Sequence, residues 1–135
     1  MDLTPKYIKM CEKADNIQEE FKATEMDLQD RLYCEKNNIE FFITRTGKIY
    51  FYSETMGDWI FLPQQDQIQE RIKKELPYLP RFYFISLQNF MEEMEYKNIL
   101  FDSYEQLFLA FYMYKKHKKV WDDEKEEWVD ETGVD

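Results

Sequence analysis

Few residues in this sequence are suited to catalysis. A serine or cysteine nucleophile usually needs a neighbouring general base, and the only histidine, His117, stands inside a run of lysines. A cation at such a position is favoured by the C-terminal end of a helix, so the pattern predicts a structural or solvated His117. The three glycines, Gly47, Gly57 and Gly133, are too scattered to form a phosphate-binding loop.

Carboxylates offer one enzymatic alternative. Asp66 and Glu70 are spaced by one helical turn, and Glu54 or Asp58 could join them from the preceding segment, a ligand set that suits Mg²⁺ in a metal-dependent nuclease. The spacing has little specificity, because 28 acidic residues bring such pairs together by chance. We therefore predict no catalytic residue, no bound metal and no cofactor, and keep the nuclease as an alternative.

The two cysteines do not form a recognisable site. Cys11 and Cys34 are widely separated and lack the further Cys or His residues of a zinc site. Two cysteines alone do not make a disulfide framework, so the sequence predicts reduced, packed thiols.

Acidic residues concentrate near the end of the chain. Residues 122–135 hold eight acids and one lysine, whereas residues 1–121 hold 20 acids and 17 bases. The basic cluster at 115–119 comes directly before this acidic segment and could partly neutralise it. Overall acidity disfavours direct binding of nucleic acid, so we expect a protein partner. The candidate partner-binding acids are Asp122, Asp123, Glu124, Glu126, Glu127, Asp130 and Glu131.

Aromatic residues, 18% of the chain, could add to a binding surface. Most of those at helical spacing are expected in the core. Tyr112 lies roughly opposite Ala110 and Tyr114 on a helical wheel and is therefore the better candidate for an exposed, partner-binding ring. The other aromatic candidates are Trp59, Phe61, Phe108, Phe111 and Tyr114.

The helices that must position these residues follow from apolar spacing and capping signals. Thr4 and Pro5 predict the start of a helix over 5–21, and Ser103 with Gln106 predicts a capping box at the start of the last helix. Pro77 ends a helix within 63–76, whose buried stripe is Ile68, Ile72 and Leu76, and residues 87–94 are typical of a further helix.

Strands are indicated by runs of branched and aromatic residues. Residues 39–44 and 48–53 predict a β-hairpin, and 59–62 a third strand. Val120-Trp121 and Trp128-Val129 predict a C-terminal hairpin that brings the two tryptophans together. Residues 81–85 look extended after a turn at Pro77 and Pro80, and 22–38 stay unassigned apart from a candidate strand at 31–34.

These elements predict an α+β fold, with a small antiparallel sheet (central β-hairpin, third strand, C-terminal hairpin) packed with about four helices. We expect one domain over residues 1–135, with flexible last residues at 130–135. No apolar run is long enough to span a membrane, and the charged N-terminus lacks the apolar region of a signal peptide, so we expect a cytoplasmic protein without membrane contact.

Two segments carry a resemblance: WIFLPQQDQIQERI at 59–72 and SYEQLFLAFYMYKKHKKVWDDEKEEWV at 103–129. The sequence resembles an uncharacterised family of small proteins from phages and prophages of Firmicutes, whose opening helix is similar in style to residues 7–18. The chain has Gln64 where the family pattern has arginine, and the longer DDEKEE replaces a compact glycine turn. The resemblance implies a mobile-element setting in a bacterial host and no assigned activity.

The favoured hypothesis is a non-enzymatic phage or prophage protein that binds, and inhibits, a host protein. Clustered carboxylates can occupy a basic channel meant for phosphates, so a nucleic-acid-handling defence enzyme such as a CRISPR nuclease is a candidate target. An accessory phage replication or assembly protein, including a homodimer formed through aromatic surface, is the alternative from another class.

Overall fold

The computed structural model describes residues 1–76 and 83–130. The chain divides into two compact units, Met1–Gln64 and Gln65–Asp135. The expectation of one domain over 1–135 stays a prediction. Asp130 belongs to a strand, so the expected flexible end at 130–135 falls almost wholly on residues outside the described ranges.

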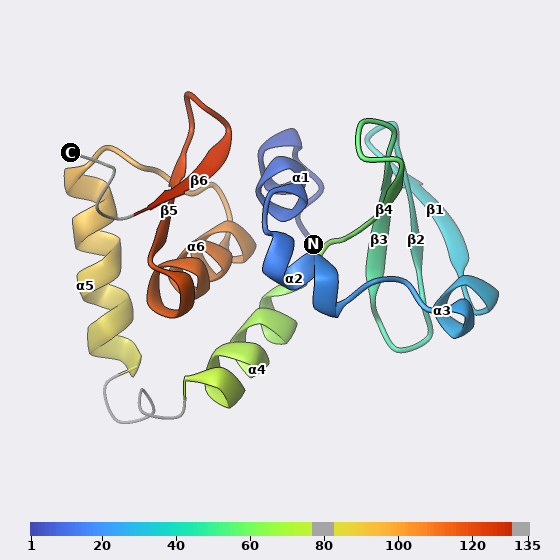
Figure 1. The fold of residues 1–135 in the computed structure, drawn as a ribbon, viewed down its shortest axis with the longest axis horizontal. Coiled ribbons are helices and arrows are strands. Elements are labelled where there is room, and N and C mark those ends of the chain that lie inside the picture. The colour runs from blue at the N-terminus through green and yellow to red at the C-terminus, as the bar shows by residue number, and fades with distance from the viewer. Residues whose placement is uncertain (77–82, 131–135) are drawn as a thin grey trace. The chain divides into compact units, whose positions relative to one another are not determined.

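The first unit contains a four-stranded antiparallel sheet with strand order β1-β2-β3-β4 (Figure 1). Its strands are β1 (Leu32–Lys36), β2 (Ile39–Ile43), β3 (Ile49–Ser53) and β4 (Asp58–Phe61). The predicted hairpin and third strand are confirmed. β1 adds a fourth strand, at the segment where the sequence suggested a short strand at 31–34.

A turn signal at Asn37-Asn38 identifies the β1–β2 hairpin, which the sequence analysis left unassigned. Lys36 pairs with Ile39, so the loop has two residues, and both have positive φ, 53° at Asn37 and 65° at Asn38. Two left-handed residues in a two-residue loop match the twist of antiparallel strands, and asparagine tolerates that conformation. The Asn37-Asn38 dipeptide could therefore have predicted this hairpin from the sequence.

The helix predicted over 5–21 is wrong as one element, because it forms two: α1 (Pro5–Glu12) and α2 (Asp15–Glu20). In an unbroken helix the Cys11 carbonyl would accept from Asp15 N–H. Here it accepts from Ala14 N–H, and from Gln18 Nε2 at 3.0 Å. A third helix, α3 (Glu25–Gln29), begins at a capping box between Thr24 and Asp27.

Gln18 joins the broken helix to the edge of the sheet. Its Oε1 atom accepts from Phe61 N–H at 2.8 Å, and its Nε2 atom donates to Phe61 O at 2.9 Å. The side-chain amide thereby takes the place of a neighbouring strand on β4. The break after α1 lets Gln18 satisfy both β4 and the freed Cys11 carbonyl.

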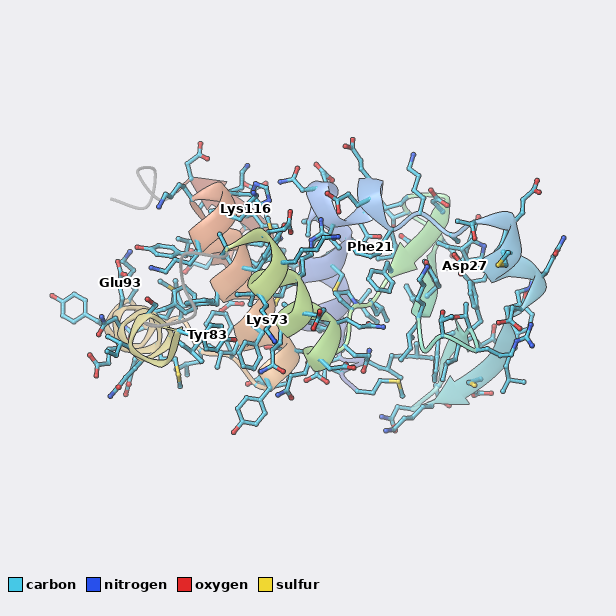
Figure 2. The ribbon with its side chains drawn as sticks, turned by 90° about the horizontal axis from the view of Figure 1, so that it is seen from below. Phe21, Asp27, Lys73, Tyr83, Glu93 and Lys116 are labelled. Carbon is cyan, nitrogen blue, oxygen red and sulfur yellow. The ribbon has the colours of Figure 1, made fainter. Side chains whose placement is uncertain are left out.

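Aromatic rings form the core of the first unit. Phe42, Tyr50 and Phe61 lie opposite one another on adjacent strands and are at most 2% exposed. Phe21, labelled in Figure 2, stacks on Phe61 with ring centroids 4.9 Å apart, and the Tyr50 hydroxyl donates to Phe21 O. Phe21, directly after α2, therefore covers part of this side of the sheet.

Over the described residues 65–76 and 83–130, the second unit contains three helices and a hairpin. The helices are α4 (Gln65–Glu75), α5 (Tyr83–Tyr96) and α6 (Tyr104–His117), and strands β5 (Lys119–Asp122) and β6 (Glu127–Asp130) form a separate two-stranded sheet. The apolar stripe predicted for the α4 segment is buried at all three positions, Ile68, Ile72 and Leu76. Figure 1 shows the hairpin beside α6. The α+β class, the C-terminal hairpin and the last helix are confirmed, with six helices in the described ranges rather than about four.

The prediction that 81–85 is extended is wrong for Tyr83–Ile85, which begin α5; residues 81 and 82, like the predicted turn at Pro77 and Pro80, lie outside the described residues. The aromatic and branched residues there favour a strand locally. Packing outweighs that preference, because Tyr83 and Phe90, seven residues apart, both contact the Phe111 ring of α6.

In the described part of the chain, no helix is both long and apolar enough to cross a lipid bilayer.

Replacing Gln18 with alanine tests the link between helix and sheet. Gln18→Ala leaves the Phe61 N–H without its acceptor, so we expect a loss of about 1–3 kcal/mol in the free energy of unfolding. Urea unfolding measures that loss, and hydrogen exchange at the Phe61 amide should become faster. Glu19→Ala, at an exposed position on the same helix, is the control; equal behaviour of the two variants would contradict the proposed role of Gln18.

Candidate functional site

The turn of the C-terminal hairpin is held by the carboxylate of Asp122, the last residue of β5. Asp122 pairs with Glu127, which leaves a four-residue loop of 123–126. Asp122 Oδ1 accepts from Glu124 N–H at 2.9 Å and from Lys125 N–H at 3.1 Å. The carboxylate thus satisfies backbone donors that the loop would otherwise leave to water.

Two tryptophans form the base of this loop. Trp121 and Trp128 lie directly opposite each other, with ring centroids 5.2 Å apart in an edge-to-face arrangement. They are 2% and 8% exposed. Trp121 Nε1 donates to Asp123 Oδ1 at 3.0 Å, so Asp123, the first residue of the loop, is also tied to the base. The predicted meeting of the tryptophans is confirmed.

The remaining acids of the hairpin point to solvent without a counter-ion. Glu124, Glu126, Glu127 and Asp130 are exposed, and within the described residues none of them takes part in an ion pair. Asp123 is also exposed, and Asp122 is half-buried. Glu131 lies outside the described residues. The structure therefore separates two acids that build the turn from four that are available for contact.

Glu126 adopts a backbone conformation that favours glycine. Its φ is 53°, in the left-handed region, which costs a residue with a Cβ about 1–2 kcal/mol. The β3–β4 loop has the same length and puts Gly57, with φ 67°, at the equivalent last position. Both loops are also braced three residues apart, Ser53 Oγ accepting from Met56 N–H as Asp122 accepts from Lys125 N–H. The acidic hairpin thus keeps a carboxylate where its counterpart has glycine.

The basic cluster before the hairpin is spread around the end of α6. Lys118 caps the helix with φ 57°, and Lys115 Nζ lies 5.9 Å from the Phe111 ring centroid. Lys116, labelled in Figure 2, is exposed. Lys119 is directly opposite Asp130 across the hairpin. The strand register therefore sets one of these lysines, Lys119, opposite an acid.

The expectation that Tyr112 is exposed is wrong, because its side chain is 1% exposed. Its hydroxyl donates to Glu75 Oε2 at 2.7 Å and accepts from Arg71 Nε at 3.2 Å, while Arg71 and Glu75 form an ion pair. Burial and the Glu75 hydrogen bond raise the pKa of Tyr112 to about 12. The wheel argument failed because α4 covers the side of α6 that a simple two-face helix would leave to solvent.

His117 ends α6, as predicted, but its environment does not favour a cation. Its ring lies 5.6 Å from that of Tyr112, and its buried Nε2 atom has no hydrogen-bond partner within the described residues. Burial lowers the pKa of His117, and the attraction of Glu75 offsets this only in part. The positive charges at this end of the helix come from lysines instead.

The carboxylates of the nuclease alternative do not form a described metal site. Glu54, Asp58, Asp66 and Glu70 are all exposed. Within residues 1–76 and 83–130, no group of three His, Cys, Asp or Glu side chains is placed to hold a metal ion. The nuclease hypothesis therefore gains no structural support from these residues.

Both cysteines are free thiols, Cys11 buried and Cys34 half-buried. Burial raises the pKa of Cys11 far above its usual range. A buried thiol that stays protonated is a packing group and a poor nucleophile.

Large apolar side chains are exposed at positions that the sequence analysis did not identify as binding residues. Met91, Leu100 and Tyr104 are 47%, 65% and 65% exposed, whereas Phe61, Phe108 and Phe111 are buried. Leu100 stands in the connection between two helices and Tyr104 at the first position of α6, where the apolar stripe of the helix has not yet begun. For Tyr104, the position at the start of the helix was the available signal.

Comparisons with family models, with curated proteins and with solved structures find no match to this chain. The resemblance to a phage family therefore stays a prediction.

Replacing Glu126 with glycine should stabilise the hairpin. Glycine adopts the left-handed region freely, so Glu126→Gly should raise the free energy of unfolding by about 0.5–1 kcal/mol after the entropy of glycine is deducted. Urea unfolding measures the change. Gly57→Ala is the converse control: its new Cβ meets nothing within 4 Å, so a loss of about 1 kcal/mol there would reflect backbone strain alone. A destabilised Glu126→Gly variant would contradict the interpretation.

His117 should make stability depend on pH below its ordinary pKa of 6.5. The folded state holds this imidazole neutral, so below pH 6.5 the unfolded chain binds more protons and unfolding is favoured. Stability contributed by the neutral ring is therefore complete above pH 6.5 and decreases as the pH falls from there toward the lowered folded pKa. His117→Gln, which removes the only histidine, should abolish this component. Parallel stability profiles of the two proteins in urea between about pH 5 and 8 would contradict it.

Proposed function

We propose that the protein is a non-enzymatic inhibitor that binds a nucleic-acid-handling protein of a bacterial host through the acidic hairpin β5–β6. A CRISPR nuclease is a candidate target, because such enzymes hold nucleic acid in positively charged channels. The hairpin would enter a groove built for phosphates and place its carboxylates against the lysines and arginines there.

The observation that carries the proposal is that glutamate, and not glycine, occupies position 126, where the backbone is in the left-handed conformation. Strained backbone persists where something other than stability favours it. Replacement by glycine would relieve the strain, but it would remove one of the four exposed carboxylates that have no counter-ion within the described residues. A role for charge in the loop accounts for glutamate rather than glycine at position 126.

The rigidity of the base supports the same function. Carboxylates on a hairpin anchored by two buried tryptophans lose less conformational entropy on binding than carboxylates on a free tail. Asp122 and Asp123 are already engaged within the hairpin, so the contact surface consists of Glu124, Glu126, Glu127 and Asp130.

Neutralising the four contact acids tests the proposal. The variant Glu124→Gln, Glu126→Asn, Glu127→Gln, Asp130→Asn keeps the turn acids and puts asparagine at the left-handed position, where it is tolerated. In capture from a host lysate at about 0.15 M salt, the wild-type protein should retain a nucleic-acid enzyme, and the variant should bind it at least tenfold more weakly. High salt or an added DNA duplex should release the enzyme from the wild-type protein.

The matched control removes the same number of charges elsewhere. Its four substitutions to glutamine are at exposed glutamates that lack ion pairs within the described residues, namely Glu19, Glu54, Glu70 and Glu92. Binding should be nearly unchanged in this control, because only non-specific attraction depends on net charge alone. Equal loss in both variants, or retention of the same partner by the hairpin variant, would contradict the proposal.

A further inference from the structure

A groove of about 420 Å³ opens in the second unit where the end of α5 faces the start of α6. Apolar side chains dominate its lining, among them Met91, Met94, Ile99, Leu100, Tyr104 and Leu107. Met94 and Leu107 are buried at its floor, whereas Met91, Leu100 and Tyr104 are about half to two-thirds exposed. An open apolar hollow with exposed walls is typical of a binding groove.

The groove is held in shape by hydrogen bonds at the end of α5. Asn98 has φ 59°, its N–H donates to Glu95 O at 3.0 Å, and Ile99 N–H donates to Met94 O at 2.8 Å. This is the Schellman arrangement, in which a left-handed residue ends the helix and the next apolar residue folds back on it. Ile99 and Met94, the two residues so joined, both line the groove.

The other wall is fixed at the start of α6. Ser103 Oγ accepts from Gln106 N–H at 3.2 Å, and Gln106 Oε1 accepts from Asp102 N–H at 3.0 Å. Gln106 is fully buried. The connection at 97–103 is therefore braced at both ends, which lowers the entropy lost when something binds there.

The rim of the groove carries negative charge. Glu95 and Asp102 line it, both are exposed, and neither forms an ion pair within the described residues. Two carboxylates beside an apolar hollow complement a ligand that combines apolar side chains with lysine or arginine. A second copy of the chain fits less well, because its own rim carries the same acids and its net charge is −10.

We propose that this groove binds an amphipathic helical segment of a partner, with apolar side chains in the hollow and basic side chains against Glu95 and Asp102. Grooves between packed helices accept such segments through apolar anchors one helical turn apart. Methionine suits the role, because its flexible thioether adapts to different anchors. This surface is separate from the acidic hairpin and does not depend on the function proposed for it.

Methyl NMR with a defined probe tests the proposal. The probe is a synthetic helical peptide of about 14 residues, with leucines at positions that form one face and lysines on both flanks. In protein labelled at methionine methyl groups, the Met91 and Met94 signals should shift and saturate. Met26 and Met56, 77% and 52% exposed in the first unit, are internal controls that should not shift.

Variants separate the groove from general attraction to an acidic protein. Leu100→Gln with Tyr104→Gln should weaken peptide binding about tenfold, and Glu95→Gln with Asp102→Asn about threefold to tenfold. Ile85→Gln with Tyr96→Gln, on exposed α5 residues outside the groove lining, should leave affinity unchanged. The hairpin variant with four neutralised acids should still show the Met91 and Met94 shifts, which keeps this test independent of the proposed function.

Three results would overturn the proposal. Shifts of equal size at Met26 and Met56 would mean non-specific attraction. Equal binding of a peptide with glutamates in place of lysines would remove the charge argument. Shifts of Met91 and Met94 that follow protein concentration without peptide would identify a second copy as the occupant.

Discussion

The contact between Trp121 and Trp128 is the interaction on which the acidic hairpin depends. Two strands of four residues do not hold together in water by their own hydrogen bonds. Burial of two indole rings supplies several kcal/mol, and Trp121 belongs to the strand that packs against α6. The loop at 123–126 is therefore fixed to the core of the second unit, and this also holds the carboxylates of the loop in place.

Concentrated negative charge opposes the folding of this loop, and the structure limits the cost in two ways. Asp122 and Asp123 accept hydrogen bonds from backbone and indole N–H groups, so that their charge contributes to the turn. The other acids remain in water, where repulsion between carboxylates is weak and is screened by salt. These arrangements do not relieve the backbone strain at Glu126, which stays in the left-handed conformation.

Elements defined by local signals were predictable from the sequence, whereas those decided by tertiary contacts were not. Runs of aromatic and branched residues identified β2, β3 and both strands of the C-terminal hairpin, and Ser103 marked the start of α6. The break at Ala14 was missed because it depends on the hydrogen bonds of Gln18 to a strand 43 residues away. Tyr112 was misplaced because the wheel of one helix does not show that α4 packs on it. The acids of the hairpin could be identified by composition, but not their division into turn-forming and exposed residues.

The two proposed binding surfaces, the hairpin and the groove, suit different parts of a binding reaction. Exposed carboxylates attract a basic partner over distances near the Debye length and act mainly on the rate of association, which falls as salt is added. The apolar lining of the groove acts only at contact, and burial of leucine- or methionine-sized side chains mainly slows dissociation and resists salt. Only the two carboxylates at its rim, Glu95 and Asp102, respond to salt. Salt dependence therefore separates the two surfaces more clearly than affinity alone. Contacts made by Glu124 or Glu126 should weaken steeply with ionic strength, while those made by Met91 or Leu100 should persist.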